Sequence, residues 1–89
     1  MQKIRPDLDI GKNIQELRRA AGMTQEQVLA KMQLLGLTIS KSSYAKIETN
    51  RLNVKVSELV ALRRILRCSY DDFFRPCEAE WEQSAAPEG

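Results

Sequence analysis

The sequence has 89 residues, 43% of them hydrophobic, and a formal net charge of +2. This length fits one domain with short extensions and a single small core. No apolar run reaches the length of a membrane span, and the first residues lack the apolar stretch of a signal peptide. We therefore expect a cytoplasmic protein that has no membrane segment.

The residues required for most enzyme and metal chemistry are missing from the sequence. It contains no histidine, and its two cysteines, Cys68 and Cys77, do not have metal-ligand spacing. In a reducing cytoplasm we expect both to remain free thiols. There is no glycine-rich phosphate loop and no carboxylate pair with catalytic spacing. The sequence predicts neither an enzyme nor a bound metal or cofactor.

The charge is distributed unevenly along the chain. Residues 1–75 carry all 14 Lys and Arg residues, against eight acidic ones. Residues 76–89 carry four acidic residues and no basic one. A basic domain suits a polyanion binder because neutralised phosphates supply much of the affinity. A solvated surface with a polar tail fits the same distribution, so charge alone does not decide.

Helix start and stop signals predict the first two helices. Asp9 can cap the first helix, and Gly22 suits the left-handed conformation at its end. Thr24 and Gln27 have the spacing of a capping box at the start of the second helix, and Gly36 can end it. The inward-facing residues expected from helical spacing are Ile10, Ile14, Leu17 and Ala21, then Val28, Leu29 and Met32.

A third helix is predicted after Ser40, which can cap it, and before Asn50, which tolerates a left-handed conformation. Tyr44 and Ile47 form its apolar side. The positions left outward are Lys41, Ser42, Ala45 and Lys46, with Ser43 towards the edge. Short hydroxyls and long cations on an exposed helix suit contacts in a DNA major groove. An ordinary solvated helix face fits these residues equally well.

The rest of the chain predicts two more helices and no strand. A fourth helix is expected at about residues 55–66, and Ser69 begins a last short helix that Pro76 should stop. Residues 76–89 then form an acidic, flexible tail. Trp81 in this tail could dock on the domain or on a partner, or be exposed. The predicted fold class is all-α.

Three segments, taken in order, resemble the phage-repressor, Cro and XRE family of helix-turn-helix regulators. The run IQELRRAAGMTQEQV from Ile14 to Val28 is similar to the family pattern I-x-x-L-R-x-x-x-G-x-T-Q-x-x-[LV]. The run SKSSYAKIETN at 40–50 resembles S-x-x-x-[IY]-x-x-[IW]-E-x-G. The run SYDDFF at 69–74 resembles S-x-D-[ED]-L-[FL]. The resemblance covers roughly residues 9–74.

The resemblance implies a compact, five-helix, lambda-repressor-like domain over residues 9–75, preceded by an N-terminal arm at 1–8. It implies a phosphate contact for Gln25 and DNA-backbone contacts for Asn50 and Arg51. It places a structural or arginine-pairing residue at Glu48. The base-reading positions that it implies are Lys41, Ser42, Ser43 and Lys46.

Roles that involve no DNA contact stay open for several of these residues. Gln25 is also a good first-turn residue, and Ser43 could serve only the helix cap. The lysines could be solvated. Lys3 and Arg5 could form a DNA-embracing arm, or the terminus could fray.

Two features depart from the family pattern. Gln33–Ile39 lengthens the usual tight turn between the second and third helices, so either the second helix is longer or the turn is an expanded loop. The angle between these helices therefore does not follow from the resemblance. Asn50 stands where the family usually has glycine, a change that the left-handed conformation tolerates.

The resemblance implies a sequence-specific regulator of transcription that binds double-stranded DNA. The expected mode is a repressor that inserts the helix at about 40–49 into the major groove and occupies its operator as a homodimer. An alternative is an antitoxin or protein-interaction module with the same fold. In that case the C-terminal region with Trp81 would engage a partner protein.

Overall fold

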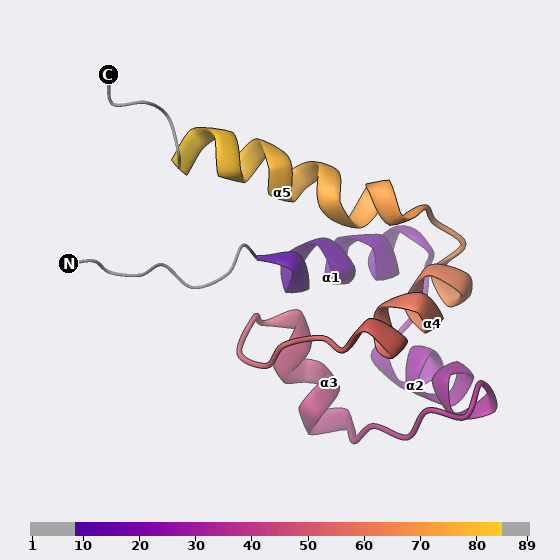
Figure 1. Ribbon diagram of the computed structural model, residues 1–89. Coiled ribbons are helices and arrows are strands. Elements are labelled where there is room, and N and C mark those ends of the chain that lie inside the picture. The colour runs from indigo at the N-terminus through magenta and orange to yellow at the C-terminus, as the bar shows by residue number, and fades with distance from the viewer. Residues whose placement is uncertain (1–8, 85–89) are drawn as a thin grey trace.

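The computed structural model describes residues 9–84, which form five helices (Figure 1). No strand occurs in this part of the chain, and the prediction of an all-α, five-helix domain is confirmed. The N-terminal arm with Lys3 and Arg5 and the last residues, 85–89, lie outside the described residues. The helices are α1 (Ile10–Ala20), α2 (Gln25–Leu34), α3 (Lys41–Glu48), α4 (Val56–Leu66) and α5 (Tyr70–Ser84).

Side-chain caps define where the first three helices begin, as predicted. The Asp9 carboxylate accepts a hydrogen bond from the Lys12 backbone N–H at 2.9 Å. At α2, Thr24 and Gln27 form the reciprocal bonds of a capping box. The Ser40 hydroxyl accepts the Ser43 backbone N–H at 3.1 Å. Each cap satisfies a backbone donor that the helix itself cannot.

Left-handed residues end α1, α2 and α3 at the predicted positions. Gly22, Gly36 and Asn50 have φ angles of 72°, 89° and 61°. Arg67 after α4 has a φ of 55°, and nothing in its sequence context predicted this. A non-glycine residue in this region carries a steric cost, which surrounding contacts must offset.

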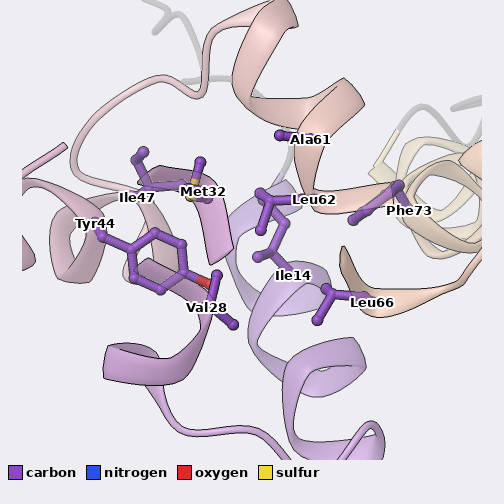
Figure 2. Close-up of a cluster of buried hydrophobic side chains, with 9 residues drawn as sticks. All are labelled: Ile14, Val28, Met32, Tyr44, Ile47, Ala61, Leu62, Leu66 and Phe73. Carbon is purple, nitrogen blue, oxygen red and sulfur yellow. The ribbon is translucent and has the colours of Figure 1, made fainter. Parts of the chain in front are cut away.

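The core lies where the helices converge (Figure 2). Tyr44 and Ile47 of α3 are buried there against Val28 and Met32 of α2, as the helical spacing predicts. The apolar side of α3 is therefore fixed in the core, and Lys41, Ser42 and Lys46 of the same helix are exposed to solvent. The nine core residues are Ile14, Val28, Met32, Tyr44, Ile47, Ala61, Leu62, Leu66 and Phe73.

The long connection between α2 and α3 is an expanded loop, because α2 ends at Leu34 and α3 begins at Lys41. The Leu37 N–H donates to the Met32 carbonyl at 3.0 Å, which closes the turn after α2. Leu37 and Ile39 are half-buried and pack against the core. Leu34, in contrast, is 84% exposed. The loop is thus held at its second half.

The expectation that Pro76 stops the last helix is wrong. Helix α5 continues through Pro76 to Ser84, so residues 76–84 of the predicted tail are helical. Proline removes one intrahelical hydrogen bond, at a cost of about 3 kcal/mol in a helix interior. Phe73 and Cys77 on either side of Pro76 are both buried, and α5 packs along α1 (Figure 1). This tertiary contact offsets the local preference.

Hydrogen bonds between α1 and α5 reinforce that packing. The Asn13 side-chain amide donates to the Phe73 carbonyl at 2.9 Å and lies 3.3 Å from the Cys77 sulfur. The Asp9 backbone N–H donates to the Glu80 carboxylate at 3.3 Å. None of these pairs is close in sequence, so the sequence patterns do not reveal them.

Candidate nucleic-acid interface

The start of α2 combines free backbone donors with a polar side chain. The first-turn N–H groups of a helix have no intrahelical partners and lie at the positive end of its dipole. A phosphate oxygen is favourable at such a position. Gln25 is the first residue of α2, and it is half-buried. This end of α2 lies beside α3, as the contacts of Gln25 show.

The side chain of Gln25 is held by α3. Its Nε2 atom donates a hydrogen bond to Glu48 Oε1 at 3.0 Å. An amide nitrogen carries two hydrogens, so one donor of Gln25 remains for a phosphate. The contact to Glu48 therefore orients Gln25 without using up its capacity to donate.

Glu48 is the centre of a buried polar network that joins three helices. It is 3% exposed, and Arg18 of α1 forms two hydrogen bonds with it, from Nε at 2.7 Å and from Nη2 at 3.0 Å. Arg18 also donates from Nη1 to the Met23 carbonyl at 2.8 Å. A bidentate pair of this kind is strong and geometrically specific. It fixes the end of α3 relative to α1 and the start of α2.

The protonation of both partners follows from this geometry. Burial by itself raises the pKa of Glu48, but the hydrogen bonds from Arg18 and Gln25 outweigh it, and the net pKa is lowered. The hydrogen bond to Glu48 raises the pKa of Arg18. Glu48 is therefore an ionised, structural residue, in agreement with the arginine-pairing role that the family resemblance implies.

A close backbone approach brings α1 against the end of α3. A Cβ atom built on Gly11 would lie 2.1 Å from the Ile47 carbonyl oxygen. Only glycine allows α1 to pass this near to α3 without displacing the backbone. Gly11 thus belongs to the support of α3, which the helical spacing of α1 did not indicate.

Lys41, the first residue of α3, forms a salt bridge with Glu26 of α2. Both side chains are exposed, Lys41 at 61% and Glu26 at 63%. The hydrogen bond from Lys41 lowers the pKa of Glu26. An exposed ion pair contributes little to stability, so a phosphate can replace Glu26 as the partner of Lys41.

The two serines of α3 differ in availability. Ser42 is exposed, whereas Ser43 is half-buried. Ser43 Oγ accepts a hydrogen bond from the Ser40 hydroxyl at 3.0 Å, and the Ser43 N–H is bound in the helix cap. The backbone N–H of Ser43 thus belongs to the cap, while its hydroxyl accepts from Ser40 and keeps its own O–H for another acceptor. Ser42 presents its side chain to solvent.

The remaining predicted residues lie towards the end of α3. Lys46 is exposed and follows Ser42 by one helical turn, so the two share a face. Asn50 and Arg51 are exposed just beyond the helix. Arg51 Nε donates to the Thr49 hydroxyl at 3.1 Å, and the Arg51 N–H donates to the Lys46 carbonyl at 2.8 Å. These bonds fix the backbone that carries Asn50 and Arg51.

The predicted site residues thus fall on one pair of helices, α2 and α3, and on the turn that follows α3. Helix α5 packs along α1, and α1 lies between α5 and α3 (Figure 1). Glu26 is the residue that sequence reasoning missed at the site. It lies 15 positions from its partner Lys41, and no motif marks a pair at that distance.

The arrangement of two helices, a recognition-type α3 and the α2 before it, defines a helix-turn-helix protein. A family model described as helix-turn-helix matches residues 14–73. The chain belongs to this family, the XRE and lambda-repressor-like helix-turn-helix proteins, and is thereby a DNA-binding regulator. Neither a curated protein nor a solved structure matches the chain significantly.

None of the helices in the described part of the chain is both long and apolar enough to cross a membrane. No group of three or more potential metal-ligating side chains occurs among the same residues. The family is a regulatory one whose members are typically not enzymes.

Proposed function

We propose that this protein is a sequence-specific repressor of transcription that acts in the cytoplasm by inserting α3 into the DNA major groove. The observation that carries the proposal is the exposed side of α3. Lys41, Ser42 and Lys46 are exposed there, beside the start of α2 with Gln25. Cations and a hydroxyl on one helix face match phosphates and base edges in a groove.

The proposed contacts divide into two kinds. Gln25, Asn50 and Arg51 bind phosphates on either side of the groove and set the position of α3. Lys46 and Ser42 reach base edges, and lysine favours the acceptors of guanine. Lys41 gives up its salt bridge with Glu26 and binds a DNA phosphate instead.

We propose that two copies bind together, because helix-turn-helix proteins of this kind read two half-sites about one helical turn apart. The operator is then an approximate palindrome. Occupying it blocks transcription. A 2:1 ratio of protein to operator by analytical ultracentrifugation is the expected result, and a 1:1 ratio would contradict the dimer.

A gel-shift titration over a range of salt concentrations tests the proposal. The probes are duplexes from upstream of the protein's own gene and a duplex of unrelated sequence. Lys46→Gln is expected to weaken specific binding by about tenfold or more and to reduce the salt slope by about one. Arg64→Gln is the matched control, since Arg64 is an exposed residue of α4 outside the proposed interface. Equal, weak binding to every duplex would refute sequence-specific recognition.

A further inference from the structure

Helix α5 carries a row of exposed aromatic side chains that the DNA interface does not use. Tyr70, Phe74 and Trp81 are 42%, 41% and 61% exposed, and the Arg63 guanidinium lies over the Tyr70 ring, 5.0 Å from its centroid. Their spacing of four and seven residues places them on one side of the helix. A soluble domain exposes single apolar side chains often, but an aligned row of three aromatic ones indicates a contact surface.

A row of charged side chains, three of the four acidic, runs next to the aromatic one. Asp71, Arg75, Glu78 and Glu82 follow one another at four, three and four residues, so they also share a side. Arg75 forms salt bridges with Asp71 and Asp72. Glu78 and Glu82 are exposed and take part in no salt bridge among the described residues. The available charge of this surface is therefore negative, at the Trp81 end.

We propose that this surface, the α5 outer face formed by Tyr70, Phe74, Trp81, Glu78 and Glu82, binds a basic amphipathic helix of another protein. Apolar side chains of that helix cover the aromatic row. Its Lys or Arg residues, one turn apart, pair with Glu78 and Glu82. Charge complementarity across an interface selects partners in this way.

Charge also argues against two other candidate occupants of this face, DNA and a second copy of the chain. DNA is repelled by the free carboxylates of this face. A second copy packed through the same face would bring its own Glu78 and Glu82 against these carboxylates, and the one base of its α5, Arg75, lies between Asp71 and Asp72. Like charges brought together in an interface are unfavourable. The position of α5 on α1, away from the exposed side of α3, leaves both surfaces usable at once (Figure 1).

Trp81 is the single tryptophan of the chain and reports directly on its own surface. The probe is a synthetic peptide of about 18 residues, helical in design, with leucines on one face and lysines beside them. Its two controls have glutamates in place of the lysines, or the same composition in scrambled order. Docking is expected to shift the Trp81 emission to shorter wavelength, with the lysine peptide binding at least about tenfold more tightly than either control.

Variants separate docking from general charge attraction. Glu78→Lys combined with Glu82→Lys is expected to weaken binding of the lysine peptide by about fivefold or more and to favour the glutamate peptide instead. Phe74→Ala is expected to weaken the lysine peptide, measured by the anisotropy of a labelled peptide. Leu34→Ala removes an exposed apolar side chain of α2, outside this surface, and is expected to change nothing. All of these side chains are exposed, so the variants should fold.

Four outcomes would overturn the proposal. The lysine and glutamate peptides could bind alike, or neither could bind. The charge-reversed variant could keep its preference for the lysine peptide. The protein alone could show a concentration-dependent Trp81 shift that Phe74→Ala abolishes, which would make a second copy the occupant. None of these outcomes depends on whether α3 binds DNA.

Discussion

The two ends of α3 are held in opposite ways. Its end is fixed by Glu48, whose side chain has no exposed area and whose partner Arg18 is 10% exposed. Its start is tied by Lys41 and Glu26, both more than 60% exposed. A buried ion pair holds geometry because breaking it leaves an uncompensated charge, whereas an exposed pair exchanges easily with water and salt. The comparison indicates a helix that is rigidly supported at one end and open to a new partner at the other.

Removing Arg18 should break the supported end most severely. Arg18→Ala leaves the Glu48 carboxylate buried without its main partner, and we expect a loss of about 3 kcal/mol in the free energy of unfolding. Urea unfolding followed by circular dichroism measures this. Arg19→Ala, an exposed neighbour on the same helix, is the control and should cost far less. A similar loss in both variants would show that the Arg18–Glu48 pair does not hold the end of α3.

The apolar replacement of both partners sharpens this test. Arg18→Met together with Glu48→Leu removes the charges without leaving one unpaired, so part of the lost stability should return. We expect this double variant to bind DNA more weakly than the unaltered protein, since Gln25 loses the acceptor that orients it. Recovery of stability without recovery of binding would separate folding from positioning.

A substitution at Gly11 tests the close backbone contact between α1 and the end of α3. In an ordinary helix interior, alanine is more favourable than glycine by about 1 kcal/mol. Gly11→Ala should reverse this sign and cost about 2 kcal/mol, because the new methyl group meets the Ile47 carbonyl. The melting temperature gives the direction directly.

Gly22→Ala is the matched control for Gly11. A Cβ atom at Gly22 meets nothing within 4 Å, and only its φ of 72° disfavours alanine. Its cost should stay near 1 kcal/mol. If Gly11→Ala were stabilising, the close contact between α1 and α3 would be refuted.

The contacts that could be predicted from the sequence are local, and those that could not be predicted join residues far apart in the chain. Caps at Asp9, Thr24 and Ser40 join residues three apart, so spacing alone is sufficient to predict them. The candidate site residues of α3 could likewise be named from their helical positions. Ser43 was the ambiguous one, because it lies in the first turn, where its N–H binds the Ser40 cap, and also at the edge of the outward face.

Contacts between residues that are far apart in the sequence could not be predicted. Pro76 is a reliable helix stop by local rules, yet burial of Phe73 and Cys77 against α1 carries α5 through it. The Glu26–Lys41 pair depends on the angle between α2 and α3, which the lengthened connection made unpredictable. Tertiary packing sets both, and no single stretch of sequence contains it.

The substitution Glu26→Gln has the smallest expected effect, and it tests the start of α3, where Lys41 and Glu26 are exposed. Glu26→Gln removes the partner of Lys41 and a negative charge beside the proposed DNA interface. We expect an almost unchanged melting temperature, because both side chains of the pair are more than 60% exposed. Affinity for duplex DNA should rise by about threefold, with a steeper salt dependence, because Lys41 is then free to bind a phosphate.

The control for Glu26 must change the net charge equally at another place. Glu16→Gln does so on an exposed residue of α1, and its effect on DNA affinity should be clearly smaller. Fluorescence anisotropy with a labelled duplex at several salt concentrations compares the two. Equal gains would mean that net charge alone matters. A loss of affinity in Glu26→Gln would mean that the carboxylate positions Lys41 for DNA instead of holding it away, and the open end of α3 would then be preorganised like the supported one.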